Sequence, residues 1–177
     1  GISIGELERS VVSHGYTKPK KGFKIPSINK KVAVIGSGLR GLTASYDLLK
    51  KGITVDIYEE NDRIGGRIWD FQGEYITSEL IKEEFLFLNE KNVKIFLNTS
   101  VDENKLNDLM SQYDAIFIAA KNLMSSYEID IKTFQVENSN VFVGKMDEAL
   151  HNSIIFSVSV GRRSAISIER YIKGTSM

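Results

Sequence analysis

Residues 31–41 read KVAVIGSGLRG, and this stretch decides the fold class. After Lys31 the chain is apolar up to Gly36, which is typical of a strand buried on both faces of a parallel sheet. The motif G-x-G-x-x-G follows and opens a helix that stops at Gly52, and a second apolar run then covers 53–58. Strand, glycine loop, helix and strand form one βαβ unit. We therefore predict an α/β fold on a parallel central sheet.

The glycines and the acid that follows them have separate physical roles. Gly36 permits the tight turn out of the strand, Gly38 lets the backbone approach a diphosphate, and Gly41 permits close packing of helix on strand. The free N–H groups and the positive end of the helix dipole stabilise phosphates. Glu59, at the end of the second run, can accept hydrogen bonds from both ribose hydroxyls and would repel a 2′-phosphate. The pattern predicts a Rossmann-like dinucleotide site that disfavours NADP. The alternative is a Rossmann-like unit whose loop binds nothing.

The loop after Glu59 distinguishes between NAD and FAD, which share this motif. Residues 59–67 read EENDRIGGR and resemble the E-x(5)-G-G-[RL] continuation of FAD-binding flavoproteins. In those proteins the glycine pair lets the chain pass close to the dinucleotide. We therefore expect FAD, the alternative being an ordinary polar loop.

The rest of the chain predicts further elements around this unit. A helix begins at Thr77 or Ser78, and strands over 93–97 and 114–120 flank a helix over 104–112. Residues 127–143 are expected to add a small β-meander. A last helix over 153–172 has Gly161 and Ala165 on its apolar stripe, and we expect it to approach the sheet closely there. The predicted organisation is an N-terminal helix and linker over 1–30, followed by a single FAD-binding domain over 31–177.

Composition excludes several other functions. The 177 residues carry 23 Lys and Arg against 23 Asp and Glu, so there is neither the basic excess of a nucleic-acid binder nor a polybasic membrane signal. The chain has no Cys, which excludes a thiolate zinc site or a Cys-ligated iron–sulfur cluster within it. No apolar run reaches the ~18 residues of a membrane span and no signal peptide is visible, so we expect the cytoplasm.

Side chains for catalysis are not evident in this sequence. His14 and His151 lack a neighbouring carboxylate or metal-ligand spacing, and we identify no candidate catalytic residue and no metal ligand. This pattern is expected where a flavin carries the chemistry.

The sequence also resembles a known family, the small subunit of glutamate synthase and its relatives among the two-dinucleotide-binding flavoproteins. The similarity begins at IGELER and passes through VAVIGSGLRGL, the acid and IGG. It continues in VKIFLNTSV, YDAIFIAA and NVFVG, and it ends in VSVGRRSAISIERYIKG. The final stretch is specific, because that family ends in a helix that reads roughly A-x-x-x-G-R-x-A-A-x-x-I-D-x-Y-L.

The resemblance implies a set of FAD-binding residues. They are Gly36, Ser37, Gly38, Leu39, Arg40, Gly41, Glu59, Glu60, Gly66, Arg67, Val101, Ala119, Ala120, Gly144, Asp147 and Ile154.

Three departures from the family pattern affect this set. Leu39-Arg40 stands where the family has Pro-Ala, and Arg40 either contacts a phosphate or faces solvent. Lys121 stands where the family has Gly. In the second FAD motif, either Met146 replaces the usual Asp or Asp147 serves with a one-residue slip, and we favour Asp147.

Two domains that members of this family possess have no counterpart in this sequence. Family members insert an NAD(P)H-binding Rossmann domain between the strands that here end near 120 and begin near 141. Only 121–140 lie between them, whereas a nucleotide-binding βαβ unit needs ~30 residues. The family's iron–sulfur domain is missing or on another chain. We therefore expect a component of a flavin-dependent oxidoreductase rather than a complete enzyme.

Such a component would relay electrons between FAD and a redox partner that carries nicotinamide or iron–sulfur centres. A partner or a homodimer mate would cover the flavin ring. The alternative is a degenerate, non-catalytic FAD-binding or scaffold module in a larger complex.

Overall fold

The structure is a computed structural model that describes residues 3–7, 10, 25–73, 76–89, 92–124, 126–137, 139–145 and 153–175. His14, Met146, Asp147 and His151 lie outside the described residues, as does much of the predicted linker. Residues 4–7 are helical, and the Ser3 hydroxyl accepts a hydrogen bond from the Glu6 N–H at 3.4 Å, as a helix start requires. Within the described ranges, no helix combines the length and apolarity needed to cross a membrane.

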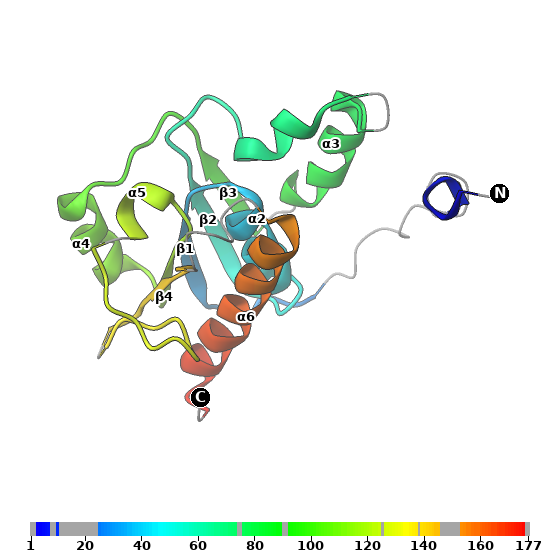
Figure 1. The fold of residues 1–177 in the computed structure, drawn as a ribbon. Helices are drawn as coiled ribbons and strands as arrows, with labels where there is room; N and C mark the ends of the chain where they lie inside the picture. Colours follow the sequence, from blue (N-terminus) through cyan, green and yellow to red (C-terminus); the bar gives the residue numbers. More distant parts are fainter. Residues whose placement is uncertain are drawn as a thin grey trace.

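A parallel sheet of five strands forms the centre of the molecule (Figure 1). The strands are β1 (Lys31–Ile35), β2 (Thr54–Tyr58), β3 (Val93–Phe96), β4 (Ala115–Ile118) and β5 (Val141–Val143). They lie in the order β3-β2-β1-β4-β5, and every neighbouring pair is parallel. This sheet confirms the predicted α/β class. Because β1 lies between β2 and β4, the chain connections diverge there and leave a crevice at the carboxyl ends of the strands.

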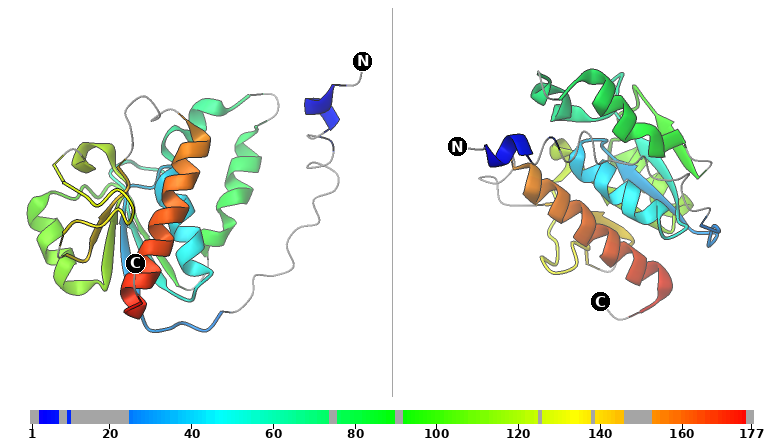
Figure 2. Two further views of the ribbon diagram at one scale, coloured as in Figure 1. Left: turned by 60° about the horizontal axis from the view of Figure 1, so that its bottom comes forward. Right: turned by 90° about the vertical axis from the view of Figure 1, so that its right-hand side faces the viewer.

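Helices cover both faces of this sheet (Figure 2). One face carries α2 (Leu39–Leu49) and α6 (Ile154–Lys173), and the other carries α4 (Glu103–Gln112) and the short α5 (Lys121–Met124). The central strands are buried from both sides, which explains their unbroken apolar runs. Near β3 lie the 3₁₀ turns η1 (Gly66–Phe71) and η2 (Phe85–Asn89), with α3 (Ser78–Glu84) between them in the chain.

The two helices on the first face touch through a glycine. A Cβ on Gly161 would lie 2.5 Å from the backbone oxygen of Arg40 and 2.9 Å from Thr43 Cβ. The predicted close approach of the last helix at Gly161 is therefore confirmed. However, the element it approaches there is α2, whereas the sheet was expected. Ala165, one turn further, does lie in the core cluster with sheet residues.

The expected β-meander is not present in the described part of 127–143. Besides β5, this segment holds turns and one antiparallel bridge, Gln135 to Phe142. Phe134 is buried with φ 64°, a left-handed conformation that interrupts an extended strand. Residues 126–137 therefore fold back beside β5 without forming a strand of their own.

Candidate dinucleotide-binding site

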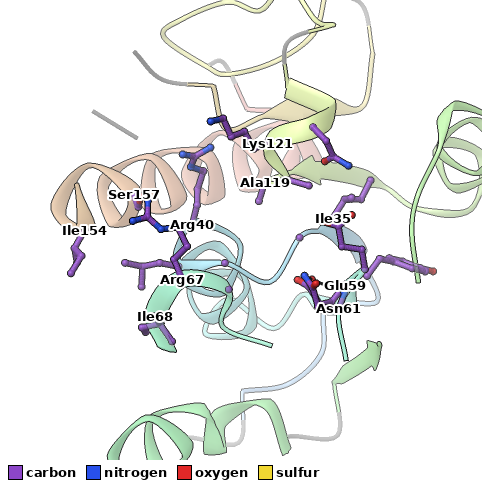
Figure 3. Close-up of a pocket in the computed structure, with 18 of the residues that line it drawn as sticks. Ile35, Arg40, Glu59, Asn61, Arg67, Ile68, Ala119, Lys121, Ile154 and Ser157 are labelled. Atoms are coloured by element: carbon purple, nitrogen blue, oxygen red, sulfur yellow. Dashed lines mark hydrogen bonds between the residues drawn. The ribbon is translucent and has the colours of Figure 1, made fainter. Parts of the chain in front are cut away.

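A cavity of about 970 Å³ opens at the carboxyl ends of β1, β2 and β4 (Figure 3). Its walls come from the glycine loop, the end of β2, the turn η1, the residues after β4 and the start of α6. This position is the crevice where open α/β sheets bind ligands. Figure 3 shows Glu59 and Asn61 at one end of the pocket and Ile154 at the other, with Arg40 and Arg67 between them.

The glycines of the first motif differ in what they face. A Cβ on Gly41 would collide with the Gly36 carbonyl oxygen, and Gly36 itself has φ 94°. These two residues are therefore required by the turn and by the packing of α2. A Cβ on Gly38 would meet nothing within 4 Å, and no side chain caps the start of α2 there. The open space lies at the N–H groups of a helix N-terminus, which suits a phosphate.

The second glycine pair packs directly on the first motif. Gly65 and Gly66 have φ 106° and 51°, in the left-handed region that favours glycine. The Gly65 N–H donates to the Ser37 carbonyl at 3.0 Å, and a Cβ on Gly66 would lie 3.3 Å from Gly38 Cα. Two segments that are distant in the sequence thus meet at one wall of the cavity.

Glu59 is held by four hydrogen bonds. Its Oε2 accepts from the Ser37 N–H at 2.8 Å and the Ser37 hydroxyl at 2.5 Å, and its Oε1 accepts from the Asn61 N–H at 3.0 Å and from Asn61 Nδ2 at 2.6 Å. Burial alone would raise the pKa of Glu59, but these bonds outweigh burial and hold the pKa below its ordinary value. The carboxylate is therefore ionised at neutral pH. Since it offers about four acceptor sites, a ribose hydroxyl must share or displace one of these donors.

Arg40 does not face solvent. Its side chain lines the cavity, and the residue is only 8% exposed. Its Nη1 donates to the Gly144 carbonyl at 2.5 Å and lies 2.9 Å from Met124 Sδ. Burial lowers the pKa of Arg40, although a guanidinium remains charged throughout the ordinary pH range. The solvent-facing alternative for Arg40 is therefore wrong.

The structure places the predicted site residues in two groups. Residues from the first group line the cavity: Gly36, Gly38, Leu39, Arg40, Glu59, Glu60, Gly66, Arg67, Val101, Ala119, Ala120 and Ile154. Ser37, Gly41 and Gly144 lie outside this lining and support it from behind. A Cβ on Gly144 would lie 2.6 Å from Arg40 Cδ, so the glycine makes room for the arginine.

Some lining residues were not predicted. Asn61 lines the cavity and donates a hydrogen bond to Glu59. Phe71, Ile76 and Leu80 form an apolar wall from η1 to α3. The sequence signals a turn near Asn61 but not its partner. The only signal for the apolar wall in the sequence is the number of apolar residues in and after the polar loop that follows Glu59.

The fold and the cavity define a Rossmann-like α/β domain with a dinucleotide-binding site. In agreement, residues 34–79 match the family model described as NAD(P)-binding Rossmann-like domain. That match runs from the end of β1 through the glycine loop, α2, β2 and η1 to the start of α3, and it contains half of the residues that line the cavity.

Known proteins match longer parts of this chain. The glutamate synthase [NADPH] small chain of Escherichia coli (strain K12) is 27% identical over 130 residues, which cover 70% of this chain and 27% of that protein. The corresponding chain of Bacillus subtilis (strain 168) is 26% identical over 121 residues, 66% of this chain and 24% of that protein. The thiamine thiazole synthase of Thermotoga maritima is 39% identical over 90 residues, 50% of this chain and 33% of that protein.

The predicted resemblance to glutamate synthase small subunits is thereby confirmed, and a dinucleotide is the class of cofactor that the matches support. The chain spans about a quarter of the length of these two small chains.

Proposed function

We propose that this chain is an FAD-binding subunit or domain of a glutamate-synthase-small-subunit-like oxidoreductase that relays electrons between the flavin and a partner. The observation that carries the proposal is the contact between Gly66 and Gly38 at the wall of a cavity that ends in Glu59. Both parts of the FAD sequence pattern thus meet at one site. A volume of about 970 Å³ lies in the range of small-molecule and cofactor pockets.

The residues present fit the two ends and the middle of such a cofactor. Glu59 would hold the ribose hydroxyls, and the open space at Gly38 would admit the diphosphate. The first turn of α6, at Ile154 and Ser157, would lie near the ring, where its N–H groups stabilise negative charge. A bound flavin would supply the electron transfer itself.

An exposed apolar rim supports a partner at this site. Ile154, Ile155 and Phe156 are consecutive at the start of α6 and are 47%, 78% and 44% exposed. Three large apolar side chains beside a cavity mouth favour a covering surface. We propose that a redox partner with nicotinamide or iron–sulfur centres, or a second copy of this chain, covers the ring here.

The division of the chain into an N-terminal segment over 1–30 and one FAD-binding domain over 31–177 belongs to the same proposal. Between β4 and β5 the described residues form α5, turns and the single bridge to Phe142. A nicotinamide nucleotide would then bind to the partner and not to this segment.

Two observations favour the alternative of a non-catalytic FAD-binding or scaffold module. The four acceptor sites of Glu59 already take protein donors, and Lys121 lines the cavity where the family has glycine. A site stabilised in this way could keep its shape without performing electron transfer.

A visible absorption spectrum tests the proposal. After incubation with FAD and removal of free ligand, we expect a bound flavin that a reduced ferredoxin reduces and NAD(P)H does not. A protein that retains no FAD overturns the proposal, and a bound flavin that cannot be reduced supports the scaffold alternative.

A matched pair of variants places the flavin in this cavity. Gly38→Val fills open space at the glycine loop, so we expect a folded protein that no longer retains FAD. Gly73→Val also enters open space, but outside the cavity lining, and should bind FAD as the parent does. Equal retention by both variants would contradict binding at the glycine loop.

A further inference from the structure

A second pocket, of about 610 Å³, lies beside the dinucleotide-binding cavity and shares none of its lining residues. The turn η1 and the helix α3 separate the two spaces. In η1, Ile68 lines the cavity and Trp69 lines the pocket. In α3, Ile81 lines the cavity and Lys82 lines the pocket. The second pocket is therefore separate from the dinucleotide site, and its volume lies in the range of small-molecule sites.

Most of the surface of this second pocket is apolar. The rings of Trp69 and Phe85 meet edge to face, with their centroids 6.2 Å apart. Trp69 Nε1 donates to the Ile64 carbonyl at 2.7 Å, so the one polar group of the indole already has its partner. Such a surface favours a ligand with an apolar body, because burying apolar area is favourable. The apolar residues that line it are Ile64, Trp69, Phe85, Leu86, Leu88 and Ile95.

Two cations border the pocket, and no Asp or Glu is among the described residues that line it. The Arg63 guanidinium lies over the Trp69 ring, 5.0 Å from its centroid, and Lys82 projects from α3. Glu79 lies three residues before Lys82, but neither cation belongs to an ion pair between residues that the structure describes. A carboxylate on the ligand would therefore complement the charge of the pocket.

We propose that this pocket is a second ligand site, which binds a small carboxylate with an aromatic or aliphatic body. The apolar body would lie against Trp69 and Phe85, and the carboxylate would lie near Arg63 and Lys82. The same two rings pack on the glycine pair of the neighbouring cavity, since a Cβ on Gly65 would lie 2.8 Å from Trp69 Nε1 and 3.0 Å from Phe85 Cζ. A ligand held by these rings would therefore also stabilise the wall between the two sites.

The fluorescence of Trp69 tests the proposal, because it is the only tryptophan of the chain. The full chain is titrated with 4-phenylbutyrate, with 4-phenyl-1-butanol as the uncharged probe, and with acetate as the carboxylate without an apolar body. We expect a saturable response to 4-phenylbutyrate, an affinity for the alcohol about three- to fivefold weaker, and no saturable response to acetate. The absence of a saturable response to 4-phenylbutyrate, or equal affinity for either of the other probes, overturns the proposal.

A matched pair of double variants tests the two cations. In Arg63→Gln combined with Lys82→Gln, the affinity for 4-phenylbutyrate should fall to that for the alcohol, and the affinity for the alcohol should stay within about twofold of the parent. Lys132→Gln combined with Arg170→Gln removes the same charge from exposed residues outside both linings and should bind as the parent does. Equal losses in both double variants would overturn the role of Arg63 and Lys82.

Hydrogen exchange measured by mass spectrometry tests the location of the probe. With saturating 4-phenylbutyrate, exchange should slow in 63–72 and 78–88, which contribute most of the pocket, and stay unchanged in 119–123, which line the dinucleotide cavity. Slower exchange in 119–123 without a change in 63–72 would place the probe in the dinucleotide cavity and overturn the proposal. Because no dinucleotide is present, the result is the same whether or not the chain retains FAD.

Discussion

Glu59 shows most clearly what individual residues contribute to this site. Its spacing from the glycine motif predicted an acid at the end of β2, and the structure places it in the cavity wall. Its partners were not predictable, because Ser37 and Asn61 lie in loops whose side-chain directions the sequence pattern does not specify. Arg40 was undecided from sequence for the same reason, and only packing against Gly144 settles its burial.

The Ser37 hydroxyl should stabilise the folded protein through the Glu59 carboxylate. Ser37→Ala removes the 2.5 Å bond to Glu59, and we expect the free energy of unfolding at pH 7 to fall by about 1–3 kcal/mol. The bonds lower the folded-state pKa of Glu59 below 4.5, so their stabilisation is complete above that pH and is lost as the pH falls through the folded pKa. Urea unfolding at pH 7 and at ~pH 3 should therefore show a smaller difference between variant and parent at low pH.

Ser164→Ala is the control for this variant. Ser164 is fully buried, and its hydroxyl oxygen has no hydrogen-bond partner among the described residues. Its removal should leave the free energy of unfolding unchanged or raise it, because a buried hydroxyl without a hydrogen-bond partner costs stability. Equal losses in both variants, or a Ser37→Ala loss that does not vary with pH, would contradict the assigned role.

At the scale of elements, the crossing of α2 and α6 fixes one wall of the cavity. The sequence located both helices; the structure confirms the predicted bounds of α6 to within one residue, whereas α2 ends at Leu49 and not at Gly52. It did not predict η1 and α5, which are too short for periodicity to be informative. It also assigned Gly161 to the sheet, because a helical stripe shows which face is apolar but not what lies against that face.

Gly161→Ala should separate these helices. An alanine in the middle of a helix normally stabilises by about 0.5–1 kcal/mol relative to glycine. Here the added Cβ would lie 2.5 Å from the Arg40 backbone oxygen, so we expect a destabilisation of about 1–3 kcal/mol instead. Chemical denaturation measures the sign, and Gly73→Ala, whose Cβ meets nothing within 4 Å, should be close to neutral. A stabilised Gly161→Ala would show that the crossing is looser than the structure indicates.

At the scale of the whole molecule, the cavity joins segments from β1 to α6, so a bound ligand should stabilise the entire domain. FAD at a hundred times its dissociation constant should add about 2.7 kcal/mol and raise the melting temperature by roughly 5–10 °C. Riboflavin lacks the adenosine diphosphate that Glu59 and the glycine loop would bind, and at equal concentration it should cause a much smaller shift. Differential scanning calorimetry makes the comparison, and equal shifts would argue against binding at the glycine loop.

The sequence by itself determined the βαβ unit, the parallel sheet, the class of ligand and the acid at the end of β2. These follow from local patterns, because apolar periodicity, glycine spacing and chain direction act over short stretches. Only the tertiary structure decided that Gly66 packs on Gly38, that Gly144 makes room for Arg40, and that Gly161 meets α2. The physical reason is that each of these is a steric contact between residues far apart in the chain, and such contacts depend on how the elements pack together.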